Sequence, residues 1–232
     1  VNLSLRPGTP MNFRWDDMRE MIAFGKLAED DTIMSYDLAW EPNWGGQAQR
    51  LQYDALWEAW VLETYGTIAA AEKAWGHPIP RGATGTVTNP SNEQTGEEGP
   101  WRDMVNAYYR FLNGLLNERY GQARELVRSV DAHHLVSFRK SMACDPTRDT
   151  HSLTYDFVGL KDAVDILEPE AYGRIGDWEH VKPGWFTAAY GRCIAPELPV
   201  LWAEFGYTVW DNSLHRPSPG RLAFAEQFYD DF

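Results

Sequence analysis

The feature that most constrains the fold is an alternation of strand-like and helix-like segments along the chain. Period-two and continuous apolar runs predict five strands, each followed by a segment whose apolar residues recur at helical spacing. The predicted strands are residues 1–6, 32–38, 135–139, 164–168 and 198–204. Because strand–helix–strand units pair their strands in parallel, the pattern indicates an α/β protein, either an open doubly wound sheet or a (β/α)₈ TIM barrel.

The chain has the length of one domain, and residues 1–232 are expected to form a single barrel domain. Residues 43–100 are expected to be an insertion after the second predicted strand. Its first part, 47–75, has the spacing of one or two helices and ends at Gly76. Its second part, 77–100, is rich in Pro, Gly, Thr and Asn and predicts a long loop. The other helices are predicted at 12–29, 101–130, 155–161, 176–195 and 221–232.

Charge and composition exclude several classes of partner. Lys plus Arg number 21 against 34 Asp plus Glu, and the net charge of -13 disfavours nucleic acid. No apolar run is long enough to cross a membrane, so no membrane partner is expected. Cys144 and Cys193 are far apart and have no zinc-type spacing. The sequence begins at Val1 and shows no leader, so localisation, secreted or cytoplasmic, stays open.

Glutamates follow the predicted strands at or near the point where each strand ends. Glu41 follows the second, Glu168 and Glu170 the fourth, and Glu204 the fifth, each with Pro or Gly within two residues. The carboxyl ends of barrel strands converge on one mouth. Carboxyl groups gathered there separate in pKa, so that one donates a proton while another stays ionised, as glycoside hydrolysis requires. A divalent-metal site built from the same acids is the competing interpretation.

Four segments resemble clan A glycoside hydrolases. YDLAWEP at 36–42 resembles the acid/base strand of the clan, which usually ends in Asn-Glu-Pro, and LPVLWAEFG at 198–206 resembles its nucleophile strand. VDILEPEAYG at 164–173 resembles the sixth strand. YGTIAAAEKAWG at 65–76 resembles a helix of family 42 β-galactosidase-like enzymes. The resemblance covers nearly the whole chain and extends to the cellulase-like family 5.

The resemblance implies roles for individual residues. Glu41 is expected to be the general acid/base and Glu204 the nucleophile. Tyr172 is expected to hydrogen-bond the nucleophile, and Glu170, which stands where many relatives have His, becomes a subsite candidate. The five visible strands then correspond to the third through seventh of the clan, and the first, second and eighth strands are missing from this sequence.

Sugar contacts are expected from aromatic side chains near the strand ends. Trp40 stands where the clan has the Asn that bonds the sugar 2-hydroxyl, and it either stacks on a sugar or forms a wall of the cleft. Trp202 is also compatible with the inner layer of the barrel, and solvated or capping roles are expected for His133 and His134. The further platform and binding candidates are Trp44, Trp210 and Arg6.

The resulting expectation is a retaining β-glycosidase that acts on an oligosaccharide or polysaccharide without a cofactor or metal. Two alternatives remain at this stage. One is a carbohydrate-binding pseudoenzyme that lost turnover through the change at Trp40, and the other is a metal-dependent lyase or isomerase that uses Glu168 and Glu170.

Overall fold

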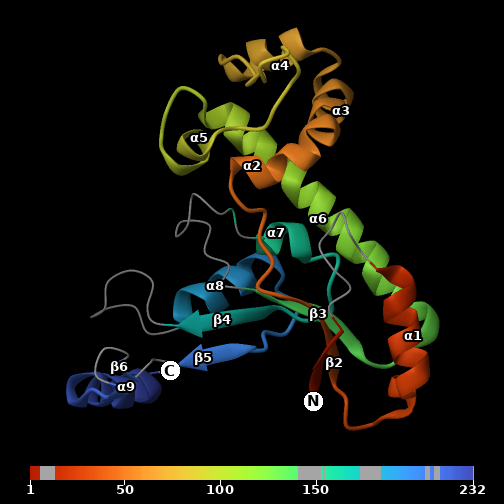
Figure 1. The fold of residues 1–232 in the computed structure, drawn as a ribbon, viewed down its shortest axis with the longest axis vertical. Helices are drawn as coiled ribbons and strands as arrows, with labels where there is room; N and C mark the ends of the chain where they lie inside the picture. The colour runs from red at the N-terminus through yellow and green to blue at the C-terminus, as the bar shows by residue number, and fades with distance from the viewer. Residues whose placement is uncertain are drawn as a thin grey trace.

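The computed structural model describes residues 1–5, 14–140, 153, 155–172, 184–206, 210–211 and 215–231. Its centre is a five-stranded, all-parallel sheet in the order β1-β2-β3-β4-β5. The strands are β1 (Asn2–Ser4), β2 (Ser35–Trp40), β3 (Leu135–Lys140), β4 (Glu168–Tyr172) and β5 (Glu204–Gly206). The sheet curls into a half-barrel (Figure 1). The α/β class and parallel pairing predicted from the sequence are confirmed, whereas the described residues do not form a closed eight-stranded barrel.

Helices connect the strands in the manner of a βαβ protein. They are α1 (Trp15–Gly25) before β2, α6 (Arg102–Val130) before β3, α7 (Phe157–Leu160) before β4, α8 (Trp185–Ile194) before β5, and α9 (Pro219–Asp231) after it. A 3₁₀ turn η1 (Leu27–Glu29) follows α1, and a small antiparallel pair joins β6 (Trp210–Asp211) to β7 (Arg216–Pro217). In the described part of the chain, no helix is long and apolar enough to span a membrane.

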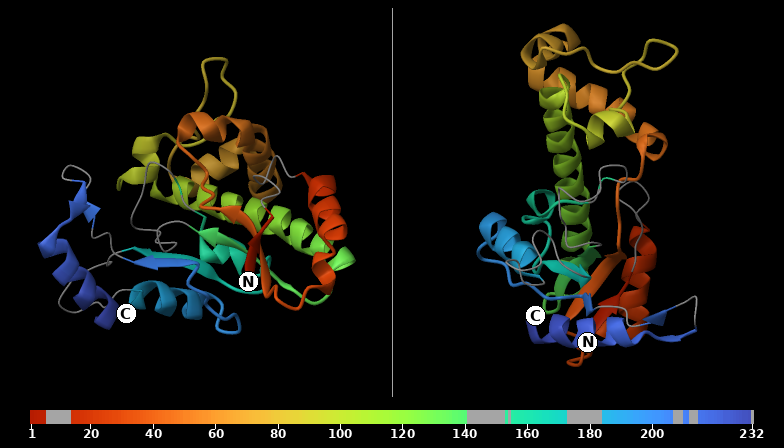
Figure 2. Two further views of the ribbon diagram at one scale, coloured as in Figure 1. Left: turned by 60° about the horizontal axis from the view of Figure 1, so that its bottom comes forward. Right: turned by 90° about the vertical axis from the view of Figure 1, so that its left-hand side faces the viewer.

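Residues 43–100 build a helical lobe that rises from the end of β2. It holds α2 (Gln47–Arg50), the 3₁₀ turn η2 (Leu51–Tyr53), α3 (Asp54–Tyr65), α4 (Ile68–Trp75) and α5 (Asn92–Gly96). The lobe stands off the sheet against the far end of α6 (Figure 2). Trp57 is fully buried there, stacked on Trp60 at 5.5 Å and on Trp75 at 5.9 Å between ring centroids. This aromatic cluster is continuous with the core of the rest of the chain, because Trp57 also packs against Tyr108 and Phe111 of α6.

Two strand boundaries differ from those expected. The fourth strand was expected at 164–168 and the fifth at 198–204, but the regular ladder runs over β4 and β5, a few residues later. The preceding apolar residues do lie side by side: Leu201 N–H donates to the Leu167 carbonyl at 2.8 Å, and Ala203 N–H donates to the Pro169 carbonyl at 3.0 Å. The ladder is interrupted there because Pro169 and Pro199 carry no backbone N–H. Consequently Glu168 and Glu204 begin their regular strands instead of ending them.

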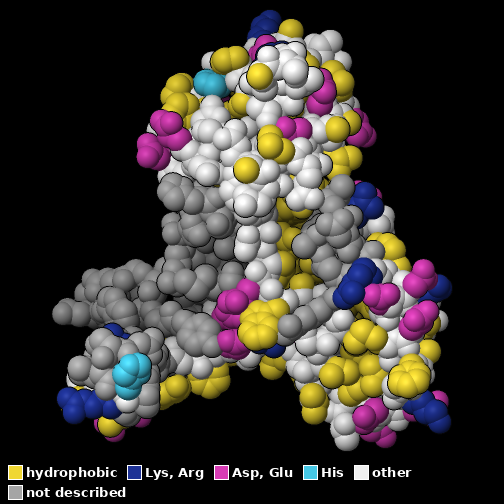
Figure 3. Space-filling model, in the orientation of Figure 1, with side chains coloured by type: hydrophobic (Ala, Val, Ile, Leu, Met, Phe, Trp, Pro, Cys, Tyr) yellow, Lys and Arg dark blue, Asp and Glu magenta, His cyan; other side chains and the backbone are white. Residues whose placement is uncertain are grey.

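Hydrophobic side chains remain exposed on helices beside both edges of the half-barrel. On α1, which follows β1, Phe24 is 94% exposed and Met21 45%. On α9, which contacts β5, Leu222 and Tyr229 are about half exposed. The space-filling view shows hydrophobic side chains gathered over the region of α1 (Figure 3). The half-barrel thus leaves apolar surface uncovered next to its edge strands.

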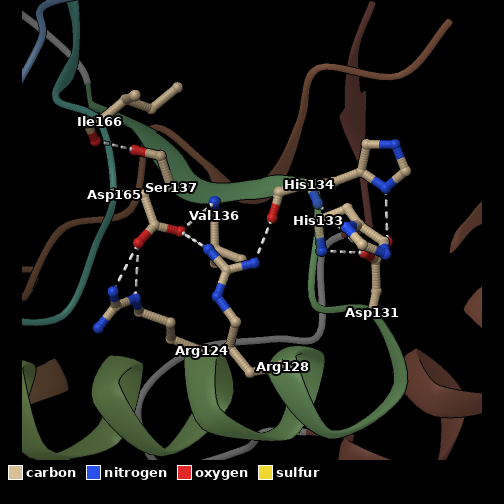
Figure 4. A network of polar contacts seen from close by, with 9 residues as sticks. All are labelled: Arg124, Arg128, Asp131, His133, His134, Val136, Ser137, Asp165 and Ile166. Atoms are coloured by element: carbon tan, nitrogen blue, oxygen red, sulfur yellow. Dashed lines mark hydrogen bonds and ion pairs between the residues drawn. The ribbon is translucent and has the colours of Figure 1, made fainter. Parts of the chain in front are cut away.

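Asp165, which lies between α7 and β4, links α6 to the amino-terminal end of the sheet. Its carboxylate accepts hydrogen bonds from Arg124 Nε at 2.8 Å, from Arg128 and from the backbone N–H of Val136 at 2.8 Å (Figure 4). These hydrogen bonds involve the charged Asp165 carboxylate, whose side chain is only 10% exposed, and charge-assisted hydrogen bonds are stronger than neutral ones. The contacts hold α6, the start of β3 and the approach to β4 together.

A second carboxylate closes the turn from α6 into β3. Asp131 accepts hydrogen bonds from the backbone N–H of His133 at 2.9 Å and from the Tyr36 hydroxyl at 2.6 Å, and its other close neighbour is the His134 ring at 2.6 Å. Burial raises the pKa of Asp131, but these hydrogen bonds outweigh it and hold the pKa below its usual range. His133 is exposed, and His134 is buried in this network just before the start of β3 (Figure 4).

Candidate active site

The backbone register brings the end of β2 and residues of β3, β4 and β5 into one row across the sheet. Trp40 pairs with Arg139, and Arg139 in turn pairs with Glu168. One step along, Glu170 pairs with Glu204 across the β4–β5 boundary. Glu41 continues the ladder of β2, since its N–H donates to the Arg139 carbonyl at 3.0 Å. The strand-end glutamates expected from the sequence therefore gather at one edge of the sheet.

Arg139 is the cation at the centre of this group. Its guanidinium donates to Glu204 Oε1, lies 3.4 Å from Asp37 Oδ2, and sits 5.0 Å from the centroid of the Trp40 ring. Burial lowers the pKa of Arg139, but the hydrogen bond to Glu204 and the charge of Asp37 outweigh it and raise the pKa above its usual value. Arg139 was not expected to be a site residue, although its position at the end of a predicted strand was the available signal.

Asp37 is a second residue that the sequence did not single out. The pairing of β2 with β3 shifts register between Asp37 and Trp40. Asp37 is fully buried, and its Oδ1 accepts the N–H groups of Ala39 at 3.2 Å and Arg139 at 3.0 Å, which the shift leaves without ladder partners. Bulges of this kind re-aim side chains next to active sites. Asp37 thus shapes the backbone that presents Trp40 and Glu41.

Glu41 itself has a strained backbone. Its φ is 46°, in the left-handed region that non-glycine residues rarely adopt. Such a conformation costs about 1–2 kcal/mol and is concentrated at functional sites. The side chain is exposed, in contrast to the buried residues of β2 that precede it. The strain is consistent with a carboxyl group held in position for chemistry.

The two carboxyl groups of β4 are buried and face one side of the sheet. Glu170 is 0% exposed and Glu168 is 1% exposed. Burial, and next the contact with the Glu41 carboxyl, raise the pKa of Glu170 to about 8. Burial, and next the charge of Asp37, raise the pKa of Glu168 to about 8. The edge of the sheet therefore contains both proton-retaining carboxyls and an ion-paired one, Glu204.

The aromatic candidates have different surroundings. Trp40 is 50% exposed at the rim of the site, and Trp202 is partly buried before β5. Trp44 was expected to be a sugar platform in a loop, but that prediction is wrong because the residue is only 3% exposed. Its ring packs edge-on against Tyr53 at 5.3 Å and tilted against Tyr155 at 4.7 Å. Trp44 belongs to the core.

Three further predictions fall outside what the structure describes. Tyr172 lies in β4 and Trp210 in β6, but only their backbone is described. Arg6 is outside the described residues altogether. The proposed contacts of these three residues stay predictions. Among the described residues, no group of three or more His, Cys, Asp or Glu side chains is arranged to hold a metal ion.

Comparisons with known proteins give a likeness in fold. No protein-family model and no curated protein matches the sequence. Among solved structures, an exo-β-agarase matches with a TM-score of 0.59 at 13% identity over 94% of this chain. The cold-adapted β-galactosidase from Rahnella sp. R3 matches with a TM-score of 0.56 at 16% identity over 93%. The catalytic domain of β-amylase from Paenibacillus polymyxa matches with a TM-score of 0.53 at 15% identity over 97%.

These three structures are glycoside hydrolases, so the half-barrel fold of this chain is one that occurs within such enzymes. The chain spans 30% of the agarase and 31% of the β-galactosidase, and 69% of the β-amylase chain. At these identities the likeness concerns the fold alone.

Proposed function

We propose that this chain carries part of the catalytic barrel of a retaining glycosidase that cleaves β-glycosidic bonds. The observation that carries the proposal is the gathering of Glu41, Glu170 and Glu204 around Arg139 at one edge of a parallel half-barrel. In barrel enzymes that edge is where catalytic residues from different strands meet. The glycoside hydrolases that share this fold give independent support.

The roles follow from the charge of each group. Glu204 is ion-paired with Arg139, which favours the ionised form that a nucleophile needs. Glu204 attacks the anomeric carbon while Glu41 protonates the departing glycosidic oxygen, and Glu41 then takes a proton from the water that releases the sugar. Trp40, half exposed beside Arg139, offers a flat surface for a sugar ring.

The barrel itself is proposed to be larger than the five described strands. We infer that these strands are the third to seventh of a clan A barrel, so that further strands pair with β1 and β5. The exposed apolar side chains on α1 and α9 support this, because a complete barrel covers such surfaces with neighbouring helices. The substrate class proposed is an oligosaccharide or polysaccharide with β-linked galactose, since the compared enzymes include an agarase and a β-galactosidase.

The test is hydrolysis of aryl β-galactosides, aryl β-glucosides and agarose oligosaccharides by wild type, Glu41→Gln and Glu204→Gln. We expect Glu204→Gln to lower kcat by more than about 1,000-fold, and Glu41→Gln to lower it by roughly 100- to 10,000-fold for unactivated substrates. Glu125→Gln, the same change at an exposed position of α6, is the matched control. Full activity in Glu204→Gln would disprove the assignment.

A carbohydrate-binding protein without turnover is the second candidate, favoured by Trp40 in place of the expected Asn. It predicts that calorimetry detects binding of the same oligosaccharides while no product forms, and that Trp40→Ala weakens binding. Binding without hydrolysis by the full-length wild-type protein that carries this chain would select this candidate over the enzyme.

A further inference from the structure

The side chain of Arg139 reaches past a neighbouring strand. Arg139 lies on β3, and its guanidinium donates to Glu204 on β5, whereas β4 lies between these two strands in the sheet. Two strand spacings amount to about 10 Å along the sheet. A long side chain that is held in one such arrangement loses much of its rotamer freedom. Further contacts along Arg139 are therefore needed to offset that loss.

The guanidinium of Arg139 also bypasses a carboxyl group on the adjacent strand. Glu168 pairs with Arg139 across the β3–β4 boundary, which puts both side chains on the same face of the sheet. Glu168 is 1% exposed, yet no N–H of Arg139 donates to either of its oxygens. Charge attraction alone does not select Glu204 over this neighbour, so other contacts direct the side chain.

Two residues at the end of β2 supply such contacts. Asp37 Oδ2 lies 3.4 Å from a guanidinium nitrogen of Arg139, and Asp37 Oδ1 accepts the backbone N–H of Arg139 at 3.0 Å. Trp40 pairs with Arg139 in the β2–β3 register, and the centroid of its ring lies 5.0 Å from the guanidinium carbon. An indole face attracts a guanidinium, and the attraction increases where water is excluded. The side chain of Arg139 is only 20% exposed, which favours this contact.

We propose that Trp40, together with Asp37, holds the guanidinium of Arg139 on Glu204 and is thereby a positioning residue for the nucleophile. The inference rests on the proposed function, and it gives Trp40 a role other than contact with a sugar. Trp40 acts through Arg139, whose positive charge favours the ionised carboxylate that attacks the anomeric carbon. Without the indole ring, the guanidinium can turn toward the carboxyls of β4, and Glu204 then loses its partner for part of the time.

The charges around Glu204 give the sign of the expected pH effect. Glu170 pairs with Glu204 across the β4–β5 boundary, and Glu41 is held near by the backbone carbonyl of Arg139. Asp37 adds a further acid on the other side of the guanidinium. Acidic neighbours disfavour ionisation of a carboxyl group, and a cation favours it. A loosened Arg139 should therefore move the acidic limb of kcat/KM to higher pH.

The kinetic experiment is a double-mutant cycle in the full-length protein that carries this chain, with Trp40→Ala, Arg139→Met and the double variant. We expect Trp40→Ala to lower kcat for aryl β-galactosides by about 2- to 30-fold, the range that corresponds to a cation–π contact, with little change in KM. In the Arg139→Met background, Trp40→Ala should have no further effect on kcat. The acidic limb should move to higher pH in both single variants.

Two further variants complete the kinetic experiment. Trp40→Phe keeps an aromatic face for the guanidinium and should retain most of kcat. Trp185→Ala, at a 60% exposed position of α8, is the matched control and should leave kcat and the acidic limb unchanged. A loss of kcat of the same size in both Arg139 backgrounds would overturn the proposal. A higher KM with unchanged kcat in Trp40→Ala would also overturn it, because that result describes a residue that only contacts the sugar.

Urea unfolding without substrate separates this proposal from the proposed function. Glu204→Gln should lower the urea midpoint less in Trp40→Ala than in wild type, because the ion pair with Arg139 is already weakened there. Equal shifts in the two backgrounds would overturn the proposal, whatever the activity. Unequal shifts together with no glycoside hydrolysis by the wild-type protein would overturn the proposed function and retain the hold of Trp40 on the Arg139–Glu204 pair.

Discussion

At the residue scale, the described part of the site places one cation, Arg139, among several acids. Asp37, Glu168 and Glu170 are buried around one guanidinium, that of Arg139. Arg139 is paired with Glu204 and Asp37, which leaves the β4 carboxyls in an environment that favours their neutral form. Neutral and ionised carboxyls side by side are the arrangement that acid/base chemistry on a glycoside needs.

This charge balance predicts how stability depends on pH. Because the pKa of Glu168 is raised to about 8 in the folded state, the folded protein binds this proton more tightly than the unfolded chain does. The stabilisation is therefore present below pH 4.5 and lost as the pH rises toward 8. In wild type, the free energy of unfolding should decline between these pH values. Replacing Glu168 by Gln should reduce the slope of that decline by at most about 1.4 kcal/mol per pH unit.

Urea unfolding at pH 5, 6, 7 and 8 measures this effect as the difference in the free energy of unfolding between wild type and Glu168→Gln. Glu125→Gln is the control, since its carboxylate is exposed on α6. Parallel pH profiles for wild type and Glu168→Gln would show that Glu168 is ionised in the folded protein.

At the element scale, the irregular end of β2 matters most. The register shift against β3 would leave two N–H groups without partners, and Asp37 accepts both. The strand then ends in Trp40 and in Glu41 with its left-handed backbone. One buried side chain thus sets the geometry of the residues that follow it.

Two substitutions at Asp37 separate its hydrogen bonds from its charge. Asp37→Asn retains an oxygen for the two N–H groups and should cost roughly 1 kcal/mol, whereas Asp37→Ala removes both acceptors and should cost about 3 kcal/mol. Chemical denaturation gives both values. Equal losses in the two variants would mean that the charge facing Arg139, and not the closure of the bulge, is what stabilises this strand end.

The sequence predicts those structural features that are determined by residues close together in the chain. The strand–helix alternation follows from the spacing of apolar residues within short segments, and it predicted the parallel sheet correctly. The short helix α5 also had a local signal, because Ser91 and Gln94 form a capping box, yet its surroundings of Pro, Gly and Thr indicated a loop. A side chain such as Trp44 is covered by Tyr53 and Tyr155, and no local pattern reports that.

The site was predictable to a similar extent. Glu41, Glu170 and Glu204 were identified because each lies near the end of a predicted strand. The Arg139–Glu204 pair joins residues 65 positions apart, and the Arg139–Asp37 pair joins residues 102 positions apart. Contacts over such separations arise from the sheet order and register, which sequence spacing alone does not determine.

At the scale of the whole molecule, a parallel half-barrel and a helical lobe share one long helix. α6 begins beside the lobe and ends at the sheet, where Arg124 and Arg128 bind Asp165 (Figures 1 and 4). The lobe follows β2 and Glu41 in the sequence. The aromatic cluster around Trp57 therefore stabilises the part of the chain that comes directly after the site. The proposed glycosidase function rests on this fold together with the candidate site.

The measurement that tests this account most directly is covalent trapping of the nucleophile. The full-length protein that carries this chain is incubated with the 2-deoxy-2-fluoro glycosyl fluoride of the sugar that it releases fastest, and the labelled peptide is identified by mass spectrometry. If Glu204 is the nucleophile, one glycosyl unit is expected on Glu204 and none in Glu204→Gln. A label on another residue, or turnover that leaves no label and gives the inverted anomer, would contradict it.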